Sequence, residues 1–192
     1  MNAYISSLEK EKAEEASAMA AYNDLNNKVA NAVEQKDYKT AIAAIDNALP
    51  NLNPRFKAPA YSLKFKTLMA YDPDQAIVFC ENWKKDDPNA IFNIINLVVY
   101  NKDVMPDKAY QMVINDCKQL KSDSRMNDVS QVSIDMTLAE CYYKLKDKNN
   151  AVRSAESAIQ TAEKIMSAPG GNQKIDAKSI EQMKKTLERY KM

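Results

Sequence analysis

The chain has 192 residues, with 27 Lys or Arg against 26 Asp or Glu, so its formal net charge is +1. A protein that binds nucleic acid usually has an excess of basic residues, and this near-balance therefore argues against a nucleic-acid partner. It has no histidine, which excludes histidine-based nucleophile systems and removes the commonest metal ligand. Its two glycines, Gly170 and Gly171, are adjacent, whereas phosphate loops need several spaced glycines and tight hairpins usually need one. We therefore predict an all-α protein that is not an enzyme and has no catalytic, cofactor or metal site.

The N-terminal 16 residues are rich in charges of both signs. Glu9-Lys10-Glu11-Lys12 is soon followed by Glu14 and Glu15, a pattern typical of a solvated helix face. We predict a charged helical extension or linker over residues 1–16, with no signal peptide in this chain, because the apolar core of such a peptide is missing. The longest apolar stretch, Ile94 to Tyr100, is interrupted by Asn96 and is far shorter than the roughly 18 residues of a membrane span, so we expect no membrane insertion.

Residues 18–167 predict four successive pairs of amphipathic helices, because apolar residues recur there at helical spacing. Tyr22, Leu25 and Val29, for example, share one face of the first helix. The predicted pairs cover residues 18–54, 57–88, 89–122 and 130–167. A Pro169-Gly170-Gly171-Asn172 turn then precedes a last helix over 175–191, whose apolar residues are spaced by 3, 4 and 3: Ile180, Met183, Leu187 and Tyr190.

An alanine recurs near the start of the second helix of each pair. Ala41 and Ala76 are 35 residues apart, Ala76 and Ala109 are 33 apart, and Ala151 follows after 42. A period near 34 residues is typical of tetratricopeptide-type repeats, and a small residue lets two antiparallel helices approach closely. We predict a right-handed superhelix of about four tetratricopeptide-like helix pairs plus a C-terminal capping helix, forming one repeat domain over residues 17–192.

Acidic residues stand where helices should begin. Asp37, Asp72 and Asp147 each precede the second helix of a pair, and Asp87 precedes Pro88 before the next pair. Aspartate is a favoured N-cap because its carboxylate accepts hydrogen bonds from the first backbone N–H groups. We therefore interpret these acids as helix caps rather than as acid–base catalysts.

The three cysteines, Cys80, Cys117 and Cys141, lie far apart in the sequence, and no CxxC motif exists. A dithiol redox site and a zinc knuckle are therefore not supported. Each cysteine lies among apolar residues at helical spacing, which predicts small buried side chains.

Several segments resemble the helical region that follows the thioredoxin-like domain in redoxin proteins of Bacteroidetes-type bacteria. The resemblance covers the whole span from about Ala18 to Met192, and the matching text is Val33–Ala41, Asp87–Ala90, Leu138–Tyr143 through Asn150–Ala151, and Met183–Tyr190. The resemblance implies an accessory helical domain next to a redoxin domain, and it leans toward a periplasmic location. The chain itself has no CxxC and no redoxin domain, so no catalytic residue is carried over.

The first helices of stacked pairs are expected to line a common surface, and here that surface is unusually apolar. Such patches mark interaction sites, although part of this one could instead pack against neighbouring repeats. The predicted groove residues are Ala30, Val33, Tyr61, Phe65, Leu68, Ile91, Ile94, Val98, Met136 and Tyr143.

The predicted function is a noncatalytic protein-interaction or scaffold module. Its predicted partner is a protein or peptide, with an upstream redoxin domain as the candidate that the resemblance implies. The alternative is a carbohydrate-binding outer-membrane lipoprotein built on similar repeats. We rank the alternative lower because such proteins carry long loops rich in Trp and Gly, whereas this chain has one Trp and two Gly.

Overall fold

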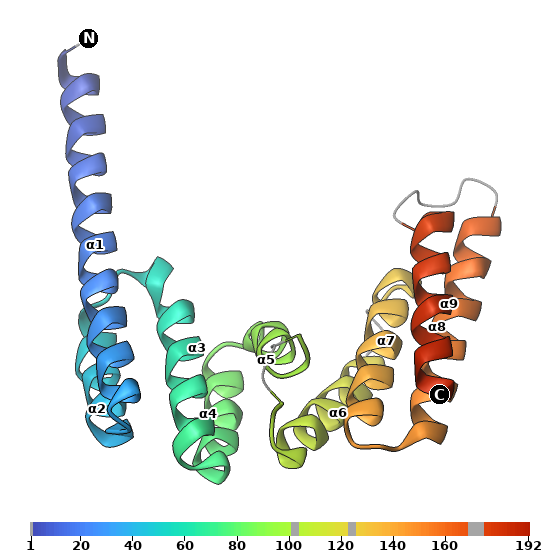
Figure 1. Cartoon of the computed structure of the whole chain (residues 1–192). Coiled ribbons are helices and arrows are strands. Elements are labelled where there is room, and N and C mark those ends of the chain that lie inside the picture. Colours follow the sequence, from blue (N-terminus) through green and yellow to red (C-terminus); the bar gives the residue numbers. More distant parts are fainter. Residues whose placement is uncertain (1, 101–103, 123–125, 169–174) are drawn as a thin grey trace. The chain divides into compact units, whose positions relative to one another are not determined.

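The computed structural model describes residues 2–100, 104–122, 126–168 and 175–192, with side chains from Leu8 onward. Every regular element in these ranges is helical, which confirms the predicted all-α class (Figure 1). The predicted Pro169–Asn172 turn lies outside the described residues. The elements are α1 (Asn2–Glu34), α2 (Tyr38–Ala48), the 3-10 helix η1 (Leu49–Asn51), α3 (Pro54–Tyr71), α4 (Pro73–Asp86), α5 (Ala90–Val99), α6 (Asp107–Lys121), α7 (Asp128–Lys144), α8 (Lys148–Ser167) and α9 (Ala177–Lys191).

The chain divides into two compact units, one ending at Ala90 and the other beginning at Ile91. The repeat domain predicted over 17–192 extends across both units and stays a prediction. The division between the units falls between the second and third predicted helix pairs.

In the first unit, α1 to α4 pack in chain order, α1 on α2, α2 on α3 and α3 on α4. The charged N-terminal extension is not a separate segment, because α1 continues through residue 16 as one helix that runs beyond α2 (Figure 1). Residues 8–17 are exposed, and burial begins at Leu25. Glu15 pairs with Arg55 of α3 at 2.5 Å, and Tyr22 stacks on Phe56 with ring centroids 5.1 Å apart.

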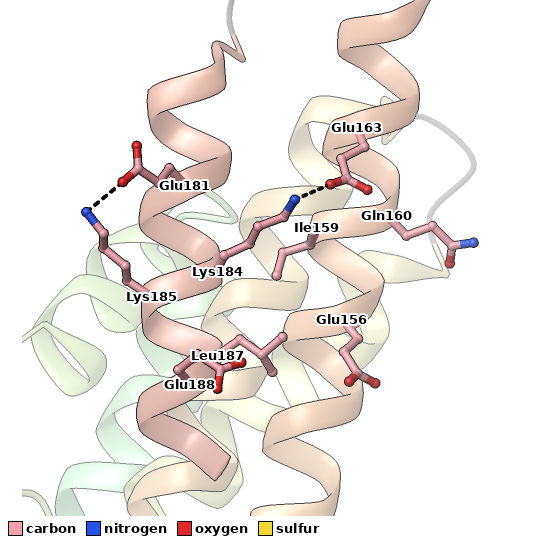
Figure 2. A pocket seen from close by; sticks show the side chains of 9 residues that line it. All are labelled: Glu156, Ile159, Gln160, Glu163, Glu181, Lys184, Lys185, Leu187 and Glu188. Atoms are coloured by element: carbon pink, nitrogen blue, oxygen red, sulfur yellow. Dashed lines mark ion pairs between the residues drawn. The ribbon is translucent and has the colours of Figure 1, made fainter. Parts of the chain in front are cut away.

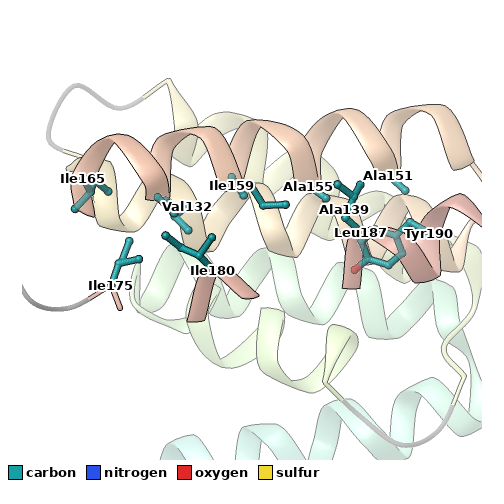
Figure 3. Packing of buried hydrophobic residues seen from close by; sticks show 12 residues of the cluster. Val132, Ala139, Ala151, Ala155, Ile159, Ile165, Ile175, Ile180, Leu187 and Tyr190 are labelled. Atoms are coloured by element: carbon teal, nitrogen blue, oxygen red, sulfur yellow. The ribbon is translucent and has the colours of Figure 1, made fainter. Parts of the chain in front are cut away.

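In the second unit, α6 packs on α7, α7 on α8 and α8 on α9. Figure 3 shows the core that α7, α8 and α9 share, in which alanines of α8 face the apolar side chains of α9. Ala151, Ala155, Ala158 and Ala162 are all fully buried. These small side chains allow close helix packing, as the sequence pattern predicted for Ala151. The other three repeat alanines, Ala41, Ala76 and Ala109, are also fully buried.

Helix α5 departs from the predicted arrangement. Its bounds agree with the third predicted pair, but among the described residues α5 and α6 are not one of the closely packed helix pairs. Only 10 residues long, α5 is apolar on most of its circumference, with Ala90, Ile94, Ile95, Val98 and Val99 buried. The spacing of apolar residues along α5 therefore does not define one face that would pack on α6.

The predicted N-caps are confirmed for three of the four aspartates. Asp37 accepts from the backbone N–H of Thr40 at 3.1 Å, and Asp147 accepts from that of Asn150 at 3.2 Å. Asp72 caps α4 in the same way. Asp87 differs, because it ends α4 and accepts from the backbone N–H of Asn89 in the turn before α5.

Two helix pairs are joined by the same turn. Lys36 between α1 and α2 has φ 59°, and Lys146 between α7 and α8 has φ 62°. In each turn the next residue, Asp37 or Asp147, donates its N–H to a carbonyl five residues back, at 2.8 and 2.9 Å. The left-handed conformation favours glycine at these positions, because a side chain there crowds the following carbonyl.

We expect Lys146→Gly to raise the free energy of unfolding by about 1 kcal/mol, because glycine adopts a positive φ without strain. Urea unfolding followed by circular dichroism measures this change. Lys164→Gly, at an exposed position inside the right-handed helix α8, is the control and should instead destabilise by about 0.5–1 kcal/mol. A loss of stability in both variants would contradict the strain at Lys146.

A cluster of polar side chains connects α9, the last helix, to α7. The Glu140 carboxylate accepts hydrogen bonds from the Tyr190 hydroxyl at 2.6 Å and from Arg189 at 2.5 Å. Burial, followed by the nearby Glu140 carboxylate, raises the pKa of Tyr190, so the phenol remains a hydrogen-bond donor. This cluster and the apolar contacts in Figure 3 make α9 an integral part of the second unit.

Candidate interaction groove

An apolar groove of about 430 Å³ lies in the second unit, between α5, α6 and α7. We call it the α5–α7 groove. We call its lining residues at α5 the α5 wall, those on α6 the floor and those at α7 the α7 wall. Among the residues that the structure describes, those that line the groove carry no charge. They are Phe92, Ile95, Asn96 and Tyr100 at α5, Cys117 and Leu120 on α6, and Met126, Val129, Ser130, Ser133, Ile134 and Thr137 at α7.

The α5 wall presents two large aromatic side chains to solvent. Phe92 is 51% exposed and Tyr100 is 63% exposed. Phe92 and Asn96 are four residues apart and share one face of α5, and Tyr100 follows four residues later, directly after the helix ends at Val99. An apolar helix is ordinarily covered by other elements on all sides. The exposure of both aromatic side chains therefore leaves an apolar surface uncovered, and such surfaces mark interaction sites.

The α7 wall is formed largely by short side chains. The Ser133 hydroxyl donates to the Val129 carbonyl at 3.4 Å, and the Thr137 hydroxyl donates to the Ser133 carbonyl at 2.9 Å. Their hydroxyl donors are therefore used within the helix. Met126, Val129 and Ile134 add apolar surface to this wall, and Ser130 adds a third hydroxyl.

The floor of the groove includes the buried Cys117 thiol. Burial, followed by the neighbouring carboxylates of Asp116 and Asp135, raises the pKa of Cys117 from its ordinary 9.0 to about 12. Cys80 and Cys141 are equally inaccessible, and burial also raises the pKa of Cys141. The prediction that the three cysteines are small buried side chains is therefore confirmed.

We expect Cys117 to react slowly with an aromatic disulfide reagent, because its thiolate fraction near pH 8 is about a thousandfold lower than that of an ordinary thiol. The test compares labelling rates with and without urea in a variant with Cys80→Ala and Cys141→Ala. The unfolded thiol ionises near 9.0 and the folded one only near 12, so stability should also fall as the pH rises above 9. Native labelling as fast as in urea would contradict this account.

A polar network centred on the buried Asp135 connects α6, α7 and α8. Asp135 of α7 is 2% exposed and accepts from the Lys121 ammonium of α6 at 2.5 Å. Its other oxygen accepts from the Ser157 hydroxyl of α8 at 2.7 Å. A buried carboxylate needs such partners, and their directions fix α6, α7 and α8 relative to one another.

The groove residues predicted from the sequence do not line this cavity. Phe65, Leu68, Ile94 and Val98 are buried in the structure, which corrects their placement on an open surface. The remaining residues of the predicted set divide into the half-buried Val33, Tyr61, Ile91 and Met136 and the exposed Ala30 and Tyr143.

Four of these accessible residues already have partners within their own unit, and Val33 is one of them because it packs against the core of the first unit. Tyr61 packs against Trp83 with ring centroids 5.2 Å apart, and Tyr143 packs against Tyr190 with centroids 4.9 Å apart. Met136 packs against the core of the second unit. They therefore contribute to internal packing rather than to an empty groove.

A second cavity, of about 480 Å³, lies between α8 and α9 (Figure 2). Its rim is charged, and the charges pair with one another: Lys184 with Glu163 at 2.6 Å and Lys185 with Glu181 at 2.8 Å. Ile159 and Leu187 provide its apolar surface. Since its cations are already neutralised, this cavity is a weaker candidate than the α5–α7 groove despite its size.

In the described ranges, no three His, Cys, Asp or Glu side chains gather as a group that could hold a metal ion. None of the helices described combines the length and the apolar character needed to cross a membrane.

Comparison with known proteins gives no matching family model, no significantly similar curated protein and no significantly similar solved structure. The resemblance to the helical region of redoxin proteins therefore stays a prediction.

Proposed function

We propose that this chain is a noncatalytic protein-interaction module that holds a segment of its partner in the α5–α7 groove. The observation that carries the proposal is the pair Phe92 and Tyr100, two aromatic residues that are each more than half exposed and that line a cavity whose described lining residues carry no charge. Aromatic residues beside a pocket are the side chains that most often dominate binding energy at protein interfaces.

The scaffold that we propose for this groove is a tetratricopeptide-like repeat array. The fully buried alanines at positions 41, 76, 109 and 151 and the matching turns at Lys36 and Lys146 support a common ancestral helix pair. The right-handed superhelix itself stays a prediction.

The partner that we propose first is a thioredoxin-like domain, because the sequence resembles the helical region that follows such a domain. The apolar lining of the groove favours a protein as the partner. The sequence resemblance is what suggests a thioredoxin-like domain as the candidate. These two parts of the proposal are tested separately.

The test begins with a displayed library of random peptides about five helical turns long, selected on the immobilised chain. Ser133→Trp is the groove variant, because an indole at this exposed wall position fills the cavity. Ser167→Trp, at an exposed position near the end of α8, is the matched control. We expect the selected peptides to bind the wild type and the control alike, and the groove variant at least about tenfold more weakly.

Two results would count against the proposal. Selected peptides that bind all three proteins equally would place the interaction surface elsewhere, and a failure to enrich any peptide would remove the interaction function. A thioredoxin-like domain supplied in trans should displace the selected peptides. If it does not, the choice of partner is wrong while the groove remains the binding site.

A further inference from the structure

We draw no further inference here: the strongest candidate, the apolar surface that Phe92 and Tyr100 leave exposed beside the α5–α7 groove, belongs to the site already described, and nothing in the structure shows what covers it.

Discussion

Phe65→Ala is expected to lower the free energy of unfolding of the first unit by about 3–5 kcal/mol, because truncating a fully buried phenylalanine leaves a cavity in the core. Phe65 is 0% exposed in α3. Trp83 is the only tryptophan of the chain and packs in the same unit, against Tyr61 and Phe79 at ring-centroid distances of 5.2 and 6.0 Å. Its fluorescence during urea unfolding therefore measures the loss.

The matched control for this experiment is Phe92→Ala, which removes the same side chain from a half-exposed position. We expect it to cost no more than about 1 kcal/mol, measured by circular dichroism, since much less apolar surface leaves the core. Phe65→Ala with the same small effect would place Phe65 on the surface, where the sequence pattern alone had located it.

Ala151→Leu is expected to destabilise the second unit by about 1–3 kcal/mol, because the larger side chain overpacks the contact between α7, α8 and α9. Ala151 is fully buried in the cluster of Figure 3. Urea unfolding followed by circular dichroism measures the effect.

Ala177→Leu provides the control for this overpacking, because Ala177 is exposed at the start of α9. It should change the stability by less than about 0.5 kcal/mol. If the two alanine variants lost stability equally, close packing at the repeat alanine would not explain the effect.

Much of the fold could be predicted from local patterns. Apolar spacing located the helices, because a helix of an α-protein must bury one face, and Ala41, Ala76, Ala109 and Ala151 indicated where helices meet closely. Asp37, Asp72 and Asp147 indicated where second helices begin, since capping depends on neighbouring backbone groups. These features are all determined by residues close in sequence.

The groove could not be located in the same way. Periodicity shows which residues share a face but not which apolar face is covered by another helix. On α5 the sequence favoured Ile94 and Val98, which are buried, whereas the exposed face is that of Phe92 and Tyr100. These two faces are two residues out of phase, or about 200° around the helix. Because α5 is apolar almost all round, tertiary packing alone decides between them.

The long first helix has a consequence for local stability. Residues 8–17 of α1 are exposed, and ion pairs along the same helix, such as Lys10 with Glu14 at 3.9 Å, contribute only weakly. The backbone amides near Leu8 are therefore protected by helix propensity alone, whereas those near Leu25 and Val29 share the cooperative unfolding of the core. Hydrogen exchange of the backbone amides should therefore slow progressively from the N-terminal to the C-terminal half of α1. One uninterrupted helix then contains amides with marginal protection at one end and full protection at the other.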